Sequence, residues 1–152
     1  MTQPLQTLIE HAERERDAAL AGVLQADENL RRLQTQQQQL QAYQADYASR
    51  APALGGHSAT IAQLRAHHAF MQRLQQALLQ QQGVVAQAEG QLRQRREQLL
   101  ACEIRLASVA KLVERRLQEV LRQSARQEQK RSDEAASQRQ GPGGGSDALL
   151  ML

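Results

Sequence analysis

Apolar side chains recur along the first third of the chain at alternating steps of four and three residues. The series spans residues 5–47, and polar side chains interrupt it at Arg16, Gln37 and Gln44. An average spacing of 3.5 residues keeps one stripe of a helix facing a partner, and it is the repeat of a left-handed coiled coil. The pattern therefore predicts a long amphipathic helix over residues 4–50.

A second series with the same spacing predicts a longer helix over residues 58–139, with Ser58 or Thr60 as its N-terminal cap. The segment APALGGH at residues 51–57 separates the two series, and its proline and paired glycines disfavour helix. We expect the hairpin loop there. Because GPGGGS follows the second helix, residues 140–152 are expected to form a flexible tail. The predicted fold is an all-α, two-helix antiparallel coiled-coil hairpin with a longer second helix and a disordered C-terminal tail.

Folding the chain about residues 53 and 54 pairs the two apolar series in antiparallel order. The predicted pairs are Tyr47 with Thr60, Leu33 with Leu74, Leu30 with Leu78, Val23 with Val85, and Ala19 with Ala88. In this register the second helix has no partner beyond Cys102. Its apolar stripe nevertheless continues through Leu106, Val109, Val113, Leu117 and Val120. An exposed stripe of this length usually marks an interaction surface, whereas self-association or a frayed helix end is the alternative.

The composition supports a coiled coil rather than a compact enzyme. Aromatic residues make up 2% of the chain, and glutamine accounts for 27 of 152 residues. Scarce aromatics disfavour α/β and all-β folds with large cores. The net charge of +3 is too small to demand a nucleic-acid partner. A single cysteine excludes an intramolecular disulfide, and no apolar run resembles a signal or a membrane span, so we expect a cytoplasmic protein.

The titratable residues do not form a catalytic or metal-binding pattern. His67 falls on the predicted seam with His68 beside it, and neither has a second ligand at helical spacing. Cys102 also occupies a seam position and is expected to be an inert thiol. The basic residues near the end of the second helix alternate with acidic ones, which is typical of a solvated helix face. We therefore expect no enzyme activity, no cofactor, no metal and no nucleic-acid partner.

Four segments in this order resemble the FliJ family, the coiled-coil stalk proteins of the bacterial flagellar type III export apparatus. They are LIEHAERERDAAL at residues 8–20, LQAYQADY at 40–47, HHAFMQRLQQALLQQ at 67–81 and RQEQKRSDEAASQR at 126–139. Together with the hairpin break, the resemblance covers both predicted helices. It implies a non-catalytic protein-export component whose hairpin is similar to the central stalk of rotary ATPases.

The resemblance also implies partners and a location. Members of the family bind the hexameric flagellar export ATPase (FliI), the export gate protein (FlhA) and export chaperones. A protein of this kind is cytoplasmic and associates peripherally with the inner face of the cell membrane at the flagellar base. Two alternatives stay open at this stage. One is the equivalent stalk of an injectisome, and the other is a structural or nucleic-acid-binding coiled coil without a secretion role.

The family's gate-contacting series of Phe, Leu, Ala and His corresponds here to Phe70, Leu74, Ala77 and Gln81, with glutamine in place of the histidine. Leu74 and Gln81 are seam positions, whereas Phe70 and Ala77 lie at the shoulder of the seam. The alternative for Phe70 is that it covers the seam near Leu40.

The ATPase-binding residues are assigned by their location and charge at the end of the hairpin that holds both termini. They are Arg14, Arg16, Arg115, Arg122 and Arg126.

Overall fold

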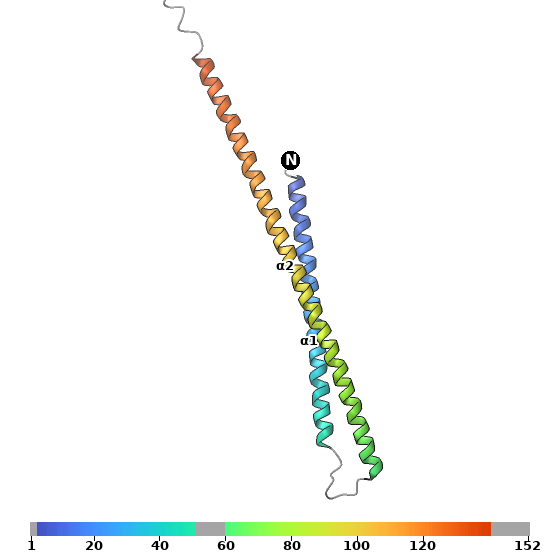
Figure 1. The fold of residues 1–152 in the computed structure, drawn as a ribbon. Coiled ribbons are helices and arrows are strands. Elements are labelled where there is room, and N and C mark those ends of the chain that lie inside the picture. Colours follow the sequence, from blue (N-terminus) through green and yellow to red (C-terminus); the bar gives the residue numbers. More distant parts are fainter. Residues whose placement is uncertain (1–2, 51–59, 141–152) are drawn as a thin grey trace, which may run out of the picture. The chain divides into compact units, whose positions relative to one another are not determined.

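The computed structural model describes residues 3–50 and 60–140, and these residues form two helices (Figure 1). Helix α1 spans Gln3–Ser49 and has 47 residues, and helix α2 spans Ile61–Arg139 and has 79 residues. The described residues contain no strand. The predicted all-α hairpin with a longer second helix is confirmed. The predicted loop at 51–57 and tail residues 141–152 lie outside the described residues.

Thr60 caps α2, one of the two residues predicted for this role. The backbone N–H of Gln63 donates to Thr60 Oγ1 at 3.2 Å, and the backbone N–H of Thr60 donates to Gln63 Oε1 at 3.2 Å. This reciprocal pair is a capping box, which satisfies two backbone donors that a helix start would leave unpaired. The local sequence Thr-Ile-Ala-Gln therefore fixes where α2 begins.

The chain divides into two compact units. The hairpin unit comprises residues 10–106, and the terminal unit comprises residues 1–9 and 107–152. Within the hairpin unit α1 and α2 run antiparallel, because Glu15 near the start of α1 contacts Arg105, whereas Tyr47 near its end contacts His67.

The hairpin unit has a thin apolar seam. Leu30, Val85, Ala88 and Leu92 form its buried cluster, and Val23, Ala26 and Leu33 pack against it. Every position of the first apolar series is buried or half-buried, including the polar ones. In the second series, which runs at the same spacing from Leu64 through Arg95 to Val113, only Arg95 is exposed. The coiled-coil spacing thus identified the buried stripe of both helices.

The register differs from the predicted one by a heptad. Tyr47 stacks on His67 instead of facing Thr60, and Leu33 accepts a hydrogen bond from Gln81 instead of facing Leu74. Leu30 likewise clusters with Val85 rather than Leu78. All three partners lie seven positions further along α2. A shift of one heptad still places seam residues of α1 opposite seam residues of α2, but pairs different residues. The spacing of apolar residues alone therefore does not distinguish the two registers.

The apolar stripe of α2 is covered further than predicted. Leu106, Val109 and Val113 are half-buried, and a register displaced toward the C-terminus of α2 accounts for this difference. From Glu114 to Gln140 every residue is exposed. The apolar stripe that remains open in the terminal unit therefore begins after Val113.

Candidate functional site

The three aromatic residues of the chain gather with one histidine where the described parts of α1 and α2 approach the connecting segment. Phe70 of α2 lies 4.4 Å from Tyr47 and 6.3 Å from Tyr43, measured between ring centroids. Tyr47 stacks on His67 at 4.8 Å with an interplanar angle of 11°. These four side chains form the aromatic cluster. His67 thus has a packing role on the seam, as the sequence indicated.

The structure separates the four predicted gate-binding residues into two pairs. Leu74 is only 7% exposed, and the half-buried Gln81 donates its Nε2–H to the backbone carbonyl of Leu33 at 3.2 Å. Both side chains are therefore committed to the seam. Phe70 and Ala77 are half-buried and retain an open face.

Two exposed apolar residues near this surface were not identified from the sequence. Tyr43 is 51% exposed and packs edge-on against Phe70, and Val84 is 38% exposed. Phe70, Ala77 and Val84 follow one another at intervals of seven, which places them on one side of α2. That spacing was present in the sequence, but it was hidden by the stronger seam pattern beside it. We call Tyr43, Phe70, Ala77 and Val84 the apolar flank.

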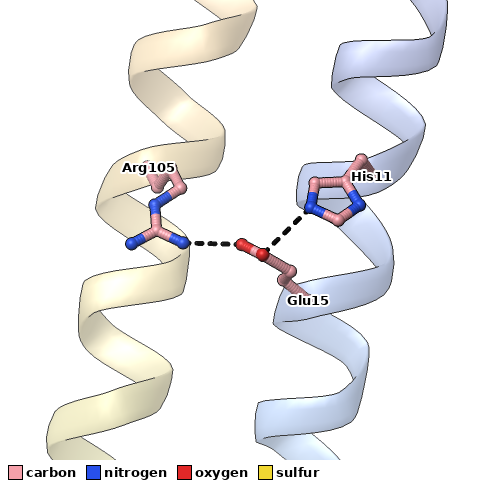
Figure 2. Close-up of polar contacts among 3 residues, drawn as sticks. All are labelled: His11, Glu15 and Arg105. Carbon is pink, nitrogen blue, oxygen red and sulfur yellow. Dashed lines mark hydrogen bonds and ion pairs between the residues drawn. The ribbon is translucent and has the colours of Figure 1, made fainter.

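Charged residues at the other end of the hairpin unit connect the two helices. Arg105 Nη1 donates to Glu15 Oε2 at 2.7 Å, and His11 Nε2 lies 3.1 Å from Glu15 Oε1 (Figure 2). The hydrogen bond from Arg105 is the main cause that lowers the pKa of Glu15, and the charges of Arg105 and His11 add to it. This contact joins α1 to α2 and is specific to one register of the hairpin.

The five predicted ATPase-binding arginines fall into two groups. Arg14 and Arg16 belong to the hairpin unit, and Arg16 is half-buried and pairs with Asp17 at 2.9 Å. Arg115, Arg122 and Arg126 belong to the terminal unit, where they line one shallow groove along α2. We call these three residues the arginine ridge.

The arginine ridge occupies the side of α2 opposite to the open apolar stripe. Its members are seven and four residues apart, which is the spacing of one helix face. The exposed stripe on the other side consists of Leu117, Val120 and Leu121, which are 45–69% exposed. This part of α2 thus offers two faces to solvent, one with three arginines and Glu119 and the other apolar.

Among residues 3–50 and 60–140, no group of histidine, cysteine, aspartate or glutamate side chains is arranged to hold a metal ion. In the same residues neither helix is apolar enough over a sufficient length to cross a membrane. Cys102, expected on the seam, is a half-buried free thiol. The predicted binding residues thus contribute to two surfaces of the described chain, the apolar flank and the arginine ridge.

Comparison with family models matches residues 1–142 to the family described as "Flagellar FliJ protein". Comparisons with curated proteins and with solved structures find no match. The family match covers both helices and agrees with the resemblance carried by the four sequence segments. The chain therefore belongs to the family of flagellar FliJ proteins, coiled-coil proteins related to flagellar export.

Proposed function

We propose that this protein is the non-catalytic central stalk of the flagellar export ATPase ring, and that it bridges the ring to the export gate and to substrate chaperones. The observation that carries the proposal is the family match over residues 1–142. It favours the flagellar system over an injectisome and over a coiled coil without a secretion role. The protein then acts in the cytoplasm, associated peripherally with the membrane at the flagellar base.

The terminal unit supplies the ring contact in this proposal. A stalk inside a ring must present different chemistry to surrounding subunits, and α2 does so with the arginine ridge on one face and exposed leucine and valine side chains on the other. Ring conformations that fit these faces best are stabilised by the difference in binding free energy. The stalk would promote ring assembly and ATP hydrolysis in this way, with Arg14 and Arg16 as the proposed contribution of α1.

The ring contact is tested by measuring ATP hydrolysis of FliI against the concentration of the chain. We expect the triple variant Arg115→Gln/Arg122→Gln/Arg126→Gln to need about tenfold more protein for half-maximal stimulation. The estimate follows from three exposed charge contacts of about 0.5 kcal/mol each. The matched control removes the same charge from exposed arginines of the hairpin unit, as Arg65→Gln/Arg73→Gln/Arg93→Gln. Equal behaviour of the two variants, or no stimulation by the wild-type chain, would contradict the stalk role.

The gate contact is proposed to use Phe70 and Ala77, the half-buried pair that retains an open face among the four residues carried over from the family. Leu74 and Gln81 would support it indirectly, because their side chains hold the seam beneath that pair.

Ala77→Gln tests the gate contact, since it places a polar side chain on a half-buried position without removing a seam residue. We expect it to weaken binding to the cytoplasmic domain of FlhA by about tenfold, which corresponds to one desolvated amide that lacks a partner. Leu79→Gln is the control, because Leu79 is 58% exposed on the same helix and lies outside the apolar flank. Unchanged binding of Ala77→Gln would remove this surface from the gate contact.

A further inference from the structure

A second groove lies in the hairpin unit, and neither the stalk nor the gate contact uses it. It has a volume of about 860 Å³ and is lined mainly by polar side chains of both helices. On α1 its lining extends from Gly22 to Thr35, and on α2 it includes Gln91, Gln94 and Arg95. Three arginines, Arg31, Arg32 and Arg95, contribute to this lining, which we call the arginine groove.

Arg95 reaches the groove beside Gly22 of α1. Arg95 occupies a seam position of α2, yet it is the one exposed member of that series. Its side chain runs beside Gly22, and a Cβ atom added at Gly22 would lie 3.6 Å from Arg95 Cδ and 3.9 Å from Nη1. The arginine stem thus crosses the surface of α1 beside Gly22 and delivers its guanidinium to the groove. An alanine Cβ at position 22 would make ordinary van der Waals contact with that stem, whereas a longer side chain such as leucine would occupy its path.

The guanidinium groups of Arg32 and Arg95 are held by neutral partners. Arg32 Nη2 donates to Asn29 Oδ1 at 2.8 Å, and Arg95 Nη1 donates to Gln98 Oε1 at 3.4 Å. Within the described part of the chain neither arginine forms an ion pair, whereas Arg31 pairs with Asp27 at 3.1 Å. A carboxylate from another molecule makes stronger, charge-assisted bonds than these amides. One acidic residue, Glu28, also lines the groove, so the lining keeps a positive balance.

The dimensions favour a polypeptide over a single anion. From Gly22 to Thr35 the helix rises about 20 Å at 1.5 Å per residue, which matches about six residues of extended chain. The amides of Gln25, Gln91 and Gln94 offer both donors and acceptors to a peptide backbone, and the hydroxyl of Thr35, which donates to the carbonyl of Arg31, offers an acceptor. We propose that the arginine groove binds an acidic polypeptide segment of a partner protein, whose carboxylates bond to Arg32 and Arg95.

The proposal is tested with the full chain and a fluorescein-labelled peptide of about twelve residues in which glutamate and serine alternate. Fluorescence anisotropy at low salt is expected to show binding below about 1 mM. Arg32→Gln/Arg95→Gln is expected to weaken binding about tenfold. The charge-matched control Arg115→Gln/Arg122→Gln is expected to stay within about twofold of the wild type. Circular dichroism checks that each variant keeps its helicity.

Gly22→Leu distinguishes an effect of the groove's shape on peptide binding from an effect of net charge, since the leucine side chain would occupy the path of Arg95 without changing any charge. We expect it to weaken peptide binding as Arg95→Gln does. The proposal is overturned if the glutamate peptide does not bind, if the groove and control variants weaken binding equally, or if Gly22→Leu binds like the wild type. It is also overturned if a thymidine oligonucleotide of equal charge binds as tightly and depends on the same arginines, which would indicate a general polyanion site. None of these outcomes depends on the response of the ATPase.

Discussion

The buried seam between α1 and α2 stabilises the hairpin, and the substitution Leu30→Ala measures the contribution of one seam residue. Leu30 is 8% exposed and lies in the buried cluster with Val85, Ala88 and Leu92. The substitution removes three carbon atoms, which at about 0.8 kcal/mol each corresponds to about 2.4 kcal/mol of lost burial. Leucine-to-alanine changes in closed cores reach about 5 kcal/mol, because an empty cavity remains.

The cost here should lie at the lower end of that range. The residues that pack against the cluster, Val23, Ala26 and Leu33, are only half-buried, so water and side-chain movement can reach the vacated space. We therefore expect Leu30→Ala to lower the free energy of unfolding by about 2–3 kcal/mol. Urea denaturation followed by circular dichroism measures it, at several protein concentrations so that self-association is detected.

Leu24→Ala is the matched control, since Leu24 lies on the same helix but is 61% exposed. Its expected cost is below about 0.5 kcal/mol, because little apolar area is lost. Both substitutions replace leucine with alanine within α1, so they change helix propensity equally. The difference between their two effects on the free energy of unfolding therefore reports the burial of Leu30. Similar costs for the two variants would refute the assignment of Leu30 to a buried seam.

Three further predictions concern the contacts outside this cluster. Glu15→Arg should lower the melting temperature and the swap Glu15→Arg/Arg105→Glu should restore most of it; a swap no more stable than the single variant would place the register elsewhere. The pKa of Glu15 is lowered below its ordinary value of 4.5, so ionised Glu15 stabilises the folded chain above that pH, and this stabilisation is lost as the pH falls through the lowered pKa. The free energies of unfolding of the wild type and of Glu15→Gln, measured by urea titration, should therefore approach each other below about pH 4.5. Phe70→Ala should destabilise the hairpin by about 1–2 kcal/mol, since it removes ring contacts with Tyr43 and Tyr47, while Phe70→Leu should cost less; equal costs, measured by thermal denaturation, would argue against ring packing.

The apolar spacing predicted both helices, and all of its positions from Leu5 to Tyr47 and from Leu64 to Val113 but one are buried or half-buried, because a two-helix seam imposes a strict repeat on the sequence. The exception, Arg95, passes beside Gly22 of the other helix, and a pairwise relation of this kind does not appear in the pattern of either helix alone. The register was wrong for a similar reason. A shift by one heptad keeps all seam positions on the seam, so the choice between registers depends on the particular contacts of Tyr47 with His67 and of Glu15 with Arg105.

The surfaces were harder to predict than the seam because partner binding uses positions that the repeat leaves unconstrained. Two helices packed about 8–10 Å apart leave little room between them, so leucine, valine and alanine form the buried cluster of the seam, and the rings of Tyr47 and His67 stack toward one of its ends. Phe70 and Tyr43 accordingly lie beside the seam, where each ring packs on one side and remains open on the other. The sequence motif grouped Phe70 with Leu74 because both belong to one family series, but their surroundings differ. Substitution of Leu74 should therefore act on any partner through the loss of hairpin stability, whereas substitution of Ala77 should act on binding at constant helicity.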